Sequence, residues 1–456
     1  MTDSDSTTLP DSIMRVLDLR GRHLSPAQLR SVVPRQTGEF LASAEDSVAS
    51  ILADVRERGA DALRELSARF DGVTQESLRV PESAVEEALG ALDPAVRRGL
   101  EVAIERTRAF AAAQRPEDAS IEVAPGARLT HRWTPVRRVG LYVPGGLAVY
   151  PSSVVMNVVP AQAAGVESVV LCTPPQQEFG GLPHPTTLAA AGLLGVQEIW
   201  AIGGAQALGA MAYGIDGEES MEPVDTITGP GNIFVAMAKR QLRAVVGVDG
   251  EAGTTEIAVL ADAHADPDFV AADLLSQAEH DPNAGSLLVT DSPALAEAVS
   301  RDLARRVSRT KHRDRVLEAL GGPQSGVVLT DSLDHGIDVV NAYAPEHLEI
   351  QTADPGTVAG RIRNAGAIFL GPYSPVPLGD YAAGSNHVLP TGGSARHSSG
   401  LCTTSFMKAV QIIEYSSDAL AAVGENVTAV ADAEDLPAHG EAITARTDRR
   451  STGGVS

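Results

Sequence analysis

The sequence predicts an α/β protein built from two Rossmann-like parallel-sheet domains, with helical extensions at both ends. Short apolar runs recur roughly 26 to 30 residues apart in the middle of the chain, the spacing of strand–helix units. Helical segments rich in Ala and Met lie between these runs, and a second series of strands and helices follows. Strands that alternate with helices in this way indicate parallel sheets covered by helices on both faces.

The first series predicts strands at 139–143, 168–172, 198–202 and 224–226, with helices at 153–164, 186–194, 205–212 and 232–245. The second predicts strands at 257–260, 286–289, 326–329, 348–351 and 367–370. Between its first two strands lies a helix at 267–279, with Asp266 as N-cap and Pro267 at the first helical position. Apolar spacing predicts further helices at 42–70 and 82–114, and a helical tail from about Ser405 to Ala421.

These elements suggest a division of the chain into an N-terminal arm, two domains, a helical segment and a tail. We expect the arm at 1–31, a first, discontinuous α/β domain at 32–138 and 257–400, and a second α/β domain at 139–256. A helical segment at 401–446 and a polar, disordered tail at 447–456 would complete the chain.

Composition excludes several classes of function. The 456 residues carry a formal net charge of −23, so neither nucleic acid nor an anionic membrane is an expected partner. Cys172 and Cys402 are the only two cysteines and share no metal-type spacing. With no signal peptide or apolar membrane span in the sequence, we expect a cytoplasmic protein. Cys172 lies in an apolar strand, which favours an inert core thiol.

Glycines follow three of the predicted strands, at 145–146, 203–204 and 229–231. Glycine between a strand and a helix allows a ligand to approach the backbone at the carboxyl edge of the sheet. No G-x-G-x-x-G follows any strand, however, and tight turns explain these glycines equally well.

Several polar residues stand in contexts that suit catalysis or metal binding. Gln277 and His280 lie three apart at the end of a capped helix, as two metal ligands would, although an exposed helix end explains them equally well. Glu346 and His347 directly precede a strand and suit proton transfer, but the dipeptide alone favours a charged loop pair.

Two further segments complete the candidate set. A glycine-flanked loop holds Asp380, Tyr381, Asn386 and His387, a density of polar groups typical of a site. His439 follows Glu434 near the end of the chain. With almost no thiol available, a zinc ion would need His and carboxylate ligands gathered from distant segments, with an amide oxygen as a further candidate.

Together these segments resemble the histidinol dehydrogenase family, over about residues 15–446. The motifs that carry the resemblance are V-G-L-Y-V-P-G-G (139–146), G-G-A-Q-A (203–207), G-P-G-N (229–232), L-L-S-Q-A-E-H (274–280), P-E-H-L (345–348), G-D-Y…N-H-V-L-P-T (379–391) and L-P-A-H (436–439). Their order along the chain makes a chance match very improbable.

The resemblance implies specific roles for individual residues. Gln277, His280, Asp380 and His439 match the zinc ligands, with His439 supplied by a neighbouring subunit of a homodimer. Tyr142, Gln206 and Asn232 match NAD contacts. Thr255, Glu346, His347, His387 and Glu434 match substrate contacts, and the four zinc ligands are expected to contact the substrate as well. Thr255 departs from the expected serine, keeping the hydroxyl and adding a methyl group.

The implied reaction is a four-electron oxidation that ends histidine biosynthesis. L-Histidinol is oxidised to a bound aldehyde and then to L-histidine, and two NAD are reduced. His347 would act as general base on the hydroxyl group, and Glu346 would activate water for attack on the aldehyde. One zinc per subunit would orient the substrate through its nitrogen atoms.

Two other functions remain compatible with the residues themselves. A zinc hydrolase would use Glu346 and His347 on water without NAD, although the strand–helix turns argue against it. A non-catalytic zinc-stabilised protein would normally have a closed, Cys-rich site, which this chain lacks.

Overall fold

The computed structural model describes residues 12–35, 44–145, 149–250 and 253–452. Residues 1–10, Gly146 of the first predicted turn and positions 453–456 of the predicted tail lie outside these ranges. The chain divides into two compact units. The first comprises residues 1–113 and 137–406, and the second comprises residues 114–136 and 407–456.

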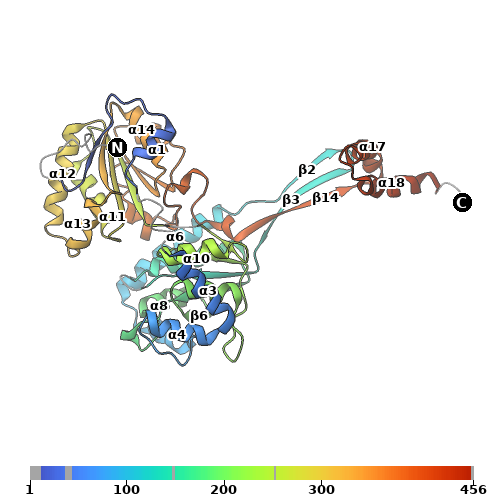
Figure 1. The fold of residues 1–456 in the computed structure, drawn as a ribbon, viewed down its shortest axis with the longest axis horizontal. Helices are drawn as coiled ribbons and strands as arrows, with labels where there is room; N and C mark the ends of the chain where they lie inside the picture. The colour runs from blue at the N-terminus through green and yellow to red at the C-terminus, as the bar shows by residue number, and fades with distance from the viewer. Residues whose placement is uncertain (1–11, 36–43, 146–148, 251–252, 453–456) are drawn as a thin grey trace. The chain divides into compact units, whose positions relative to one another are not determined.

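The first unit contains two parallel sheets (Figure 1). The first sheet has six strands in the order β1-β11-β10-β9-β12-β13. They are β1 (Val16–Asp18), β9 (Glu256–Ala261), β10 (Gly285–Thr290), β11 (Gly326–Leu329), β12 (His347–Gln351) and β13 (Ala367–Leu370). The last five confirm the second predicted strand series. Strand β1, from the predicted N-terminal arm, adds an edge strand beside β11.

Helices cover both faces of this sheet. One face packs against α11 (Pro267–Ala278), α12 (Pro293–Val307) and α13 (Arg313–Gly321). The other packs against α1 (Pro26–Val32), α14 (Leu333–Tyr343) and α15 (Pro355–Ala359). Burial on both faces explains why these strands are nearly continuous apolar runs rather than alternating ones.

The second sheet has five parallel strands in the order β6-β5-β4-β7-β8. The strands are β4 (Arg138–Tyr142), β5 (Ser168–Thr173), β6 (Glu198–Ala201), β7 (Thr226–Thr228) and β8 (Gly247–Val248). The helices that follow them are α7 (Pro151–Ala164), α8 (Pro185–Leu193), α9 (Gly204–Tyr213) and α10 (Ile233–Leu242). The first predicted series is confirmed, except that β7 begins where the predicted strand 224–226 ends.

The N-terminal helices pack against the helices that cover the second sheet. They are α3 (Glu45–Arg58), α4 (Ala60–Phe70), α5 (Glu82–Ala91) and α6 (Pro94–Ala113). Val48 and Leu63 share a core with Trp200 and Met211, while α5 contacts α8 and α6 contacts α7. This packing differs from the predicted grouping of 32–138 with the first sheet. An amphipathic pattern shows which helix face is buried, not which sheet buries it.

The second unit contains an antiparallel sheet in the order β14-β3-β2 and two helices packed against each other. Its elements are β2 (Ala119–Ala124), β3 (Ala127–Pro135), β14 (Met407–Tyr415), α17 (Ser417–Ala433) and α18 (Pro437–Thr452). The predicted helix at 405–421 is therefore wrong over residues 407–415, because this segment pairs with β3 along its whole length. Helix α18 also continues to Thr452, into the predicted tail.

None of the helices in the described part of the chain is long and apolar enough to span a membrane.

The turn between β7 and α10 is the tightest of the three predicted glycine turns. Gly229 has a φ of +118°, and a Cβ at this position would overlap the carbonyl oxygen of Tyr142 at the end of β4. The turn is also anchored to the chain after β8, because Asp249 accepts a hydrogen bond from the Gly229 amide at 2.9 Å. Lys239 Nζ bonds both the Gly229 carbonyl and Asp249, each at 2.5 Å.

We expect Gly229→Ala to lower the free energy of unfolding by roughly 3 kcal/mol or more, because backbone strain and steric overlap add. Gly180→Ala is the matched control. Gly180 also has a positive φ of +63°, but no atom lies within 4 Å of a Cβ there, so only the strain of about 1 kcal/mol should remain. Chemical denaturation of both variants measures the difference. Equal destabilisation would show that the approach to Tyr142 has no energetic weight.

Candidate active site

The predicted catalytic residues lie at the amino edge of the first sheet. Glu346 immediately precedes β12 and His347 is its first residue, while Thr255 precedes the neighbouring strand β9. Helix α11 returns along the sheet from the far end of β9, so its last turn, with Gln277, lies at the same edge. Residues 91 positions apart in sequence are therefore within hydrogen-bonding distance.

A chain of hydrogen bonds connects these residues. Gln277 Nε2 donates to Thr255 Oγ1 at 2.8 Å, and Thr255 Oγ1 donates to Glu346 Oε2 at 2.6 Å. The Glu256 amide donates to the same carboxylate oxygen at 2.9 Å. Thr255 thus uses the hydroxyl group that a serine would also offer. Gln277 Oε1 is left buried without a hydrogen-bond partner.

Glu346 is a buried carboxyl group with a strongly perturbed pKa. The residue is only 6% exposed, and burial raises its pKa to about 8, assisted by the negative charge of Asp380. The two hydrogen bonds it accepts and the nearby His280 oppose this shift. Glu346 therefore retains its proton at neutral pH unless additional positive charge is present.

His347 has one ring nitrogen bonded and the other free. Nδ1 lies 3.2 Å from the carbonyl oxygen of Glu256, which can only accept, so Nδ1 carries the proton in the neutral ring. Nε2 is consequently an acceptor, and it is buried without a partner. Burial lowers the pKa of His347, which keeps the imidazole neutral at pH 7. A neutral imidazole with a free Nε2 is suited to accept a proton.

The remaining predicted metal ligands of the first unit are His280 and Asp380. His280 follows α11, and its Nδ1 bonds the carbonyl oxygen of Ser276 at 3.1 Å, which leaves Nε2 free. Asp380 lies in helix α16 (Val376–Tyr381) and is close enough to raise the pKa values of Glu346, His347 and His387. Within the described ranges, no three His, Cys, Asp or Glu side chains form a metal-binding group.

His387 connects the loop after α16 to the second sheet's helices. Its Nδ1 bonds the carbonyl oxygen of Asp380 at 3.1 Å, and its Nε2 lies 3.2 Å from Ser153 Oγ on α7. The neighbouring Asn386 donates to the carbonyl oxygen of Met156, also on α7, at 2.6 Å. His387 is also close enough to His347 and His280 for their charges to lower its pKa, so these three histidines form one cluster.

Glu434 and His439 lie in the second unit. Glu434 caps the end of α17 and His439 is in the first turn of α18, and both side chains are exposed. The turn between the helices contains Asp435, which has a φ of +56°. The assignment of both residues to the site stays a prediction.

The three predicted NAD contacts lie at the carboxyl edge of the second sheet. Tyr142 ends β4 and is buried, with its hydroxyl oxygen accepting the Gly204 amide at 2.9 Å. Gln206 lies in the first turn of α9, and Asn232 caps α10 by accepting from the amides of Phe234 and Val235. Two helix N-termini therefore begin at this edge, an arrangement that favours phosphate groups.

Several residues that support this site were not predicted from the sequence. The backbone amide of Glu256 contacts Glu346 and its backbone carbonyl contacts His347, while its side chain pairs with Arg35 at 3.2 Å. Lys239 and Asp249 form the buried pair that holds the Gly229 turn. The backbone contacts of Glu256 leave no signal in the sequence. The position of Lys239 on the apolar face of α10 does give one, because lysine is almost never fully buried without a partner and its position therefore indicates a buried ion pair.

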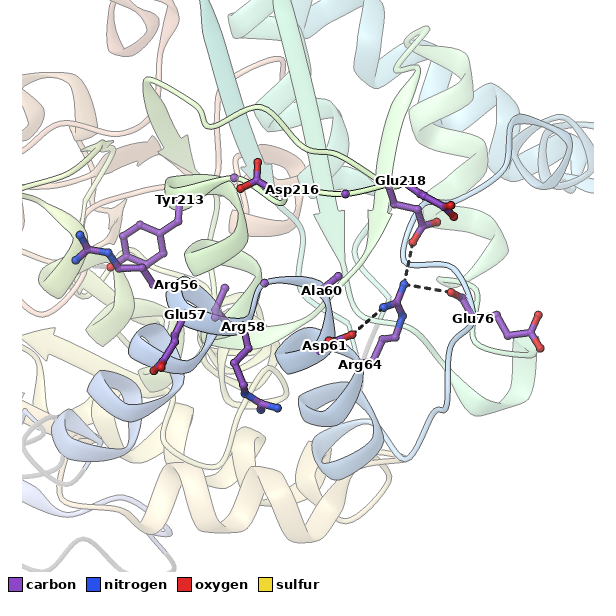
Figure 2. Close-up of a pocket in the computed structure, with 15 residues that line it drawn as sticks. Arg56, Glu57, Arg58, Ala60, Asp61, Arg64, Glu76, Tyr213, Asp216 and Glu218 are labelled. Carbon is purple, nitrogen blue, oxygen red and sulfur yellow. Dashed lines mark hydrogen bonds and ion pairs between the residues drawn. The ribbon is translucent and has the colours of Figure 1, made fainter.

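A cavity of about 690 Å³ lies elsewhere in the first unit, at the junction of α3 and α4 and beside residues 213–219 (Figure 2). It is lined by none of the predicted site residues. Its Arg64 already pairs with Asp61 at 3.4 Å and with Glu219 at 3.5 Å. The predicted site residues therefore lie at the sheet edges and not in this cavity.

Comparison with known proteins gives a consistent result over nearly the whole chain. The family model described as histidinol dehydrogenase matches residues 35–447. The chain is 60% identical to histidinol dehydrogenase of Thermobifida fusca over 438 residues, which cover 96% of this chain and 98% of the relative. It is 56% identical to the Mycobacterium bovis enzyme over 445 residues, covering 97% of this chain and 100% of the relative.

A solved structure has the same fold. The crystal structure of histidinol dehydrogenase from Elizabethkingia anophelis aligns with a TM-score of 0.89 at 31% sequence identity, and the alignment covers 96% of this chain and 99% of the other. The chain therefore belongs to the histidinol dehydrogenase family, whose members oxidise histidinol to histidine with NAD in histidine biosynthesis.

Proposed function

We propose that this chain oxidises L-histidinol to L-histidine through L-histidinaldehyde, using two NAD and one zinc ion per subunit, with Glu346 and His347 as the proton-transfer groups. One observation supports this assignment of residues. His347 Nε2 is a buried hydrogen-bond acceptor without a partner, and the preceding residue, Glu346, is a buried carboxyl group. Together they suit two proton removals at one carbon atom.

His347 would act in the first oxidation. Its Nε2 accepts the proton of the substrate hydroxyl group while the carbon-bound hydride passes to NAD, which yields the aldehyde and NADH. The hydrogen bond from Nδ1 to the Glu256 carbonyl keeps the ring in the tautomer that this step needs. Because burial lowers the pKa of His347, the ring is available as a base across the neutral range.

Glu346 would act in the second oxidation. Its carboxylate removes a proton from the water that attacks the aldehyde carbon, and the resulting hydrate loses a hydride to the second NAD. The carboxyl group is held at Oε2 by Thr255 and the Glu256 amide, so Oε1 remains to meet the water. This role requires the ionised form, which needs nearby positive charge because the pKa is about 8.

The residues at this edge fit a zinc ion. Gln277 presents a buried, unpartnered carbonyl oxygen, His280 has a free Nε2, and Asp380 lies close to both Glu346 and His347. These are nitrogen and oxygen donors of the kind found in exchangeable catalytic sites. When bound, zinc would orient the substrate nitrogens and supply positive charge beside Glu346.

The fourth donor would be His439 of a second subunit in a homodimer, with Glu434 of the same subunit contacting the substrate. Support comes from the second unit, which carries exposed apolar side chains that a partner would cover. These include Ile121, Ile413 and Val430, each more than half exposed.

NAD would bind along the carboxyl edge of the second sheet, with Tyr142, Gln206 and Asn232 contacting it beside the N-termini of α9 and α10. Both cysteines are unpaired, which supports the cytoplasm as the compartment in which the enzyme works.

The roles of the two catalytic residues can be separated by supplying either L-histidinol or L-histidinaldehyde with NAD. We expect His347→Asn to slow histidinol oxidation by roughly 10²- to 10⁴-fold, because a general base contributes about that factor. We expect Glu346→Gln to slow aldehyde oxidation by a similar factor, with a smaller effect on the first step. NADH absorbance measures both rates, and each variant is the control for the other. Full activity in both variants would overturn the assignment.

Co-expression of two inactive variants tests whether His439 comes from the partner. If it does, a mixed dimer of His347→Asn and His439→Asn chains contains one intact site, and random assembly should restore about a quarter of wild-type activity. Each variant expressed alone should remain inactive. If instead each chain supplies its own His439, the mixture will be no more active than its components.

A further inference from the structure

Two buried carboxyl groups, Asp273 and Glu349, lie behind the candidate metal site and have no part in the reaction described above. Asp273 on α11 is 8% exposed and Glu349 on β12 is 1% exposed. Their side chains are hydrogen-bonded to each other. Two carboxyl groups can form such a bond only when one of them keeps its proton, because two carboxylates at this separation repel.

The periodicities of the helix and the strand bring the pair together. Asp273, Gln277 and His280 share one face of the α11 segment, while His347 and Glu349 share one face of β12. Four helical residues rise about 6 Å and two strand residues rise about 6.6 Å, so the spacings match. The carboxyl pair therefore lies one turn of α11 and two strand residues of β12 further from the sheet edge than Gln277 and His347.

The pair also holds the element that carries Asp380. Glu349 Oε1 accepts a hydrogen bond from the amide of Val376 at 3.0 Å. Val376 is the first residue of α16, and Asp380 lies one turn later in that helix. Through this bond, Glu349 connects β12 to α16 as well as to α11.

Few other polar groups face the pair. Gln351 on β12 donates from Nε2 to Glu349 Oε2 at 3.4 Å. Arg306 on α12 lowers the pKa of Asp273, although its guanidinium is paired with Asp268 at 2.7 Å. Burial nevertheless raises the pKa of Asp273, and burial together with the Asp273 charge raises that of Glu349 well above its ordinary value.

We propose that Asp273 and Glu349 are positioning residues whose shared proton fixes α11, β12 and α16 relative to one another, so that Gln277, His280 and Asp380 converge on one metal ion. This inference rests on the zinc site of the proposed function. The pair touches neither substrate nor metal, and it acts by holding the three ligand-bearing elements together.

The pair should make both stability and zinc affinity depend on pH. Because folding raises the pKa of Glu349, the folded chain holds a proton that the unfolded chain releases. The stabilisation is therefore complete below the ordinary pKa of a glutamate and decreases as the pH rises toward the raised value. Above that value two buried carboxylates repel and the three elements separate.

Three variants of the purified full-length protein test this, with zinc affinity measured by competition with a chromophoric chelator. Glu349→Gln keeps an acceptor for the Val376 amide and a donor for Asp273, so its dissociation constant for zinc should stay within about threefold of wild type near neutral pH. Glu349→Leu removes both bonds and should weaken zinc binding at least about tenfold. Ser286→Ala is the matched control, since it removes a different buried hydrogen bond to α11, at the Leu274 carbonyl.

The pH dependence provides the second readout. As the pH rises above the ordinary pKa of a glutamate, the wild type should progressively lose zinc affinity and metal-free stability relative to Glu349→Gln, because the amide has no proton to release. Asp273→Asn also needs no shared proton, so its zinc affinity and stability should not show the pH dependence of the wild type. This variant replaces Glu349→Leu if Glu349→Leu does not fold.

The proposal would be overturned if Glu349→Leu bound zinc as tightly as Ser286→Ala does. It would also be overturned if Asp273→Asn and Ser286→Ala had equal zinc affinity at high pH. Parallel pH profiles of the wild type and Glu349→Gln would overturn it as well. A wild type that binds no zinc would contradict the proposed metal site and not the pair. In that case the pH-dependent stability of the metal-free chains still decides whether the proton is shared.

Discussion

The pairing of β9 with β12 is the constraint on which the active site depends. These two strands are adjacent in the first sheet, and the backbone of Glu256 at the start of β9 lies beside the start of β12. The Glu256 amide donates to Glu346 and the Glu256 carbonyl accepts from His347, so the backbone of one residue orients both of the proposed proton-transfer groups. If the register shifted by one residue, the side chains of Glu346 and His347 would each point to the other face of the sheet.

The proposed catalytic groups and the predicted NAD contacts lie at opposite edges of two different sheets. Open parallel sheets usually bind ligands at the carboxyl edge, where Tyr142 and Asn232 lie in the second sheet. Glu346 and His347 lie instead at the amino edge of the first. The loop of residues 384–388 joins these regions through the bonds of Asn386 and His387 to α7.

Much of this arrangement was predictable from the sequence. The parallel strands were recognisable because they are buried on both faces and separated by helices, and the motif resemblance identified the family. The strand β14 was mistaken for helix because it is largely exposed and lacks a clear alternating pattern, although Val410, Ile412 and Ile413 are β-branched. Its pairing with β3 is a contact across more than 270 residues, which local spacing does not reveal.

The details of the site were less accessible. Spacing identified Gln277 with His280 and Glu346 with His347, but not the bond from Gln277 through Thr255 to Glu346, which joins three segments. The tautomer of His347 depends on a backbone carbonyl, and the raised pKa of Glu346 depends on burial. Both are properties of the assembled fold. The assignments of His439 and Glu434 remain predictions from the resemblance.

In the proposed function, one site carries out both oxidations of one substrate with the help of a metal ion. The most direct measurement is the number of NADH formed for each L-histidinol consumed by the zinc-loaded protein in excess NAD, before and after chelation. We expect about two NADH per histidinol, with the activity lost on chelation and restored by added zinc. One NADH per histidinol, or a yield of two that survives complete removal of the metal, would contradict the proposed function.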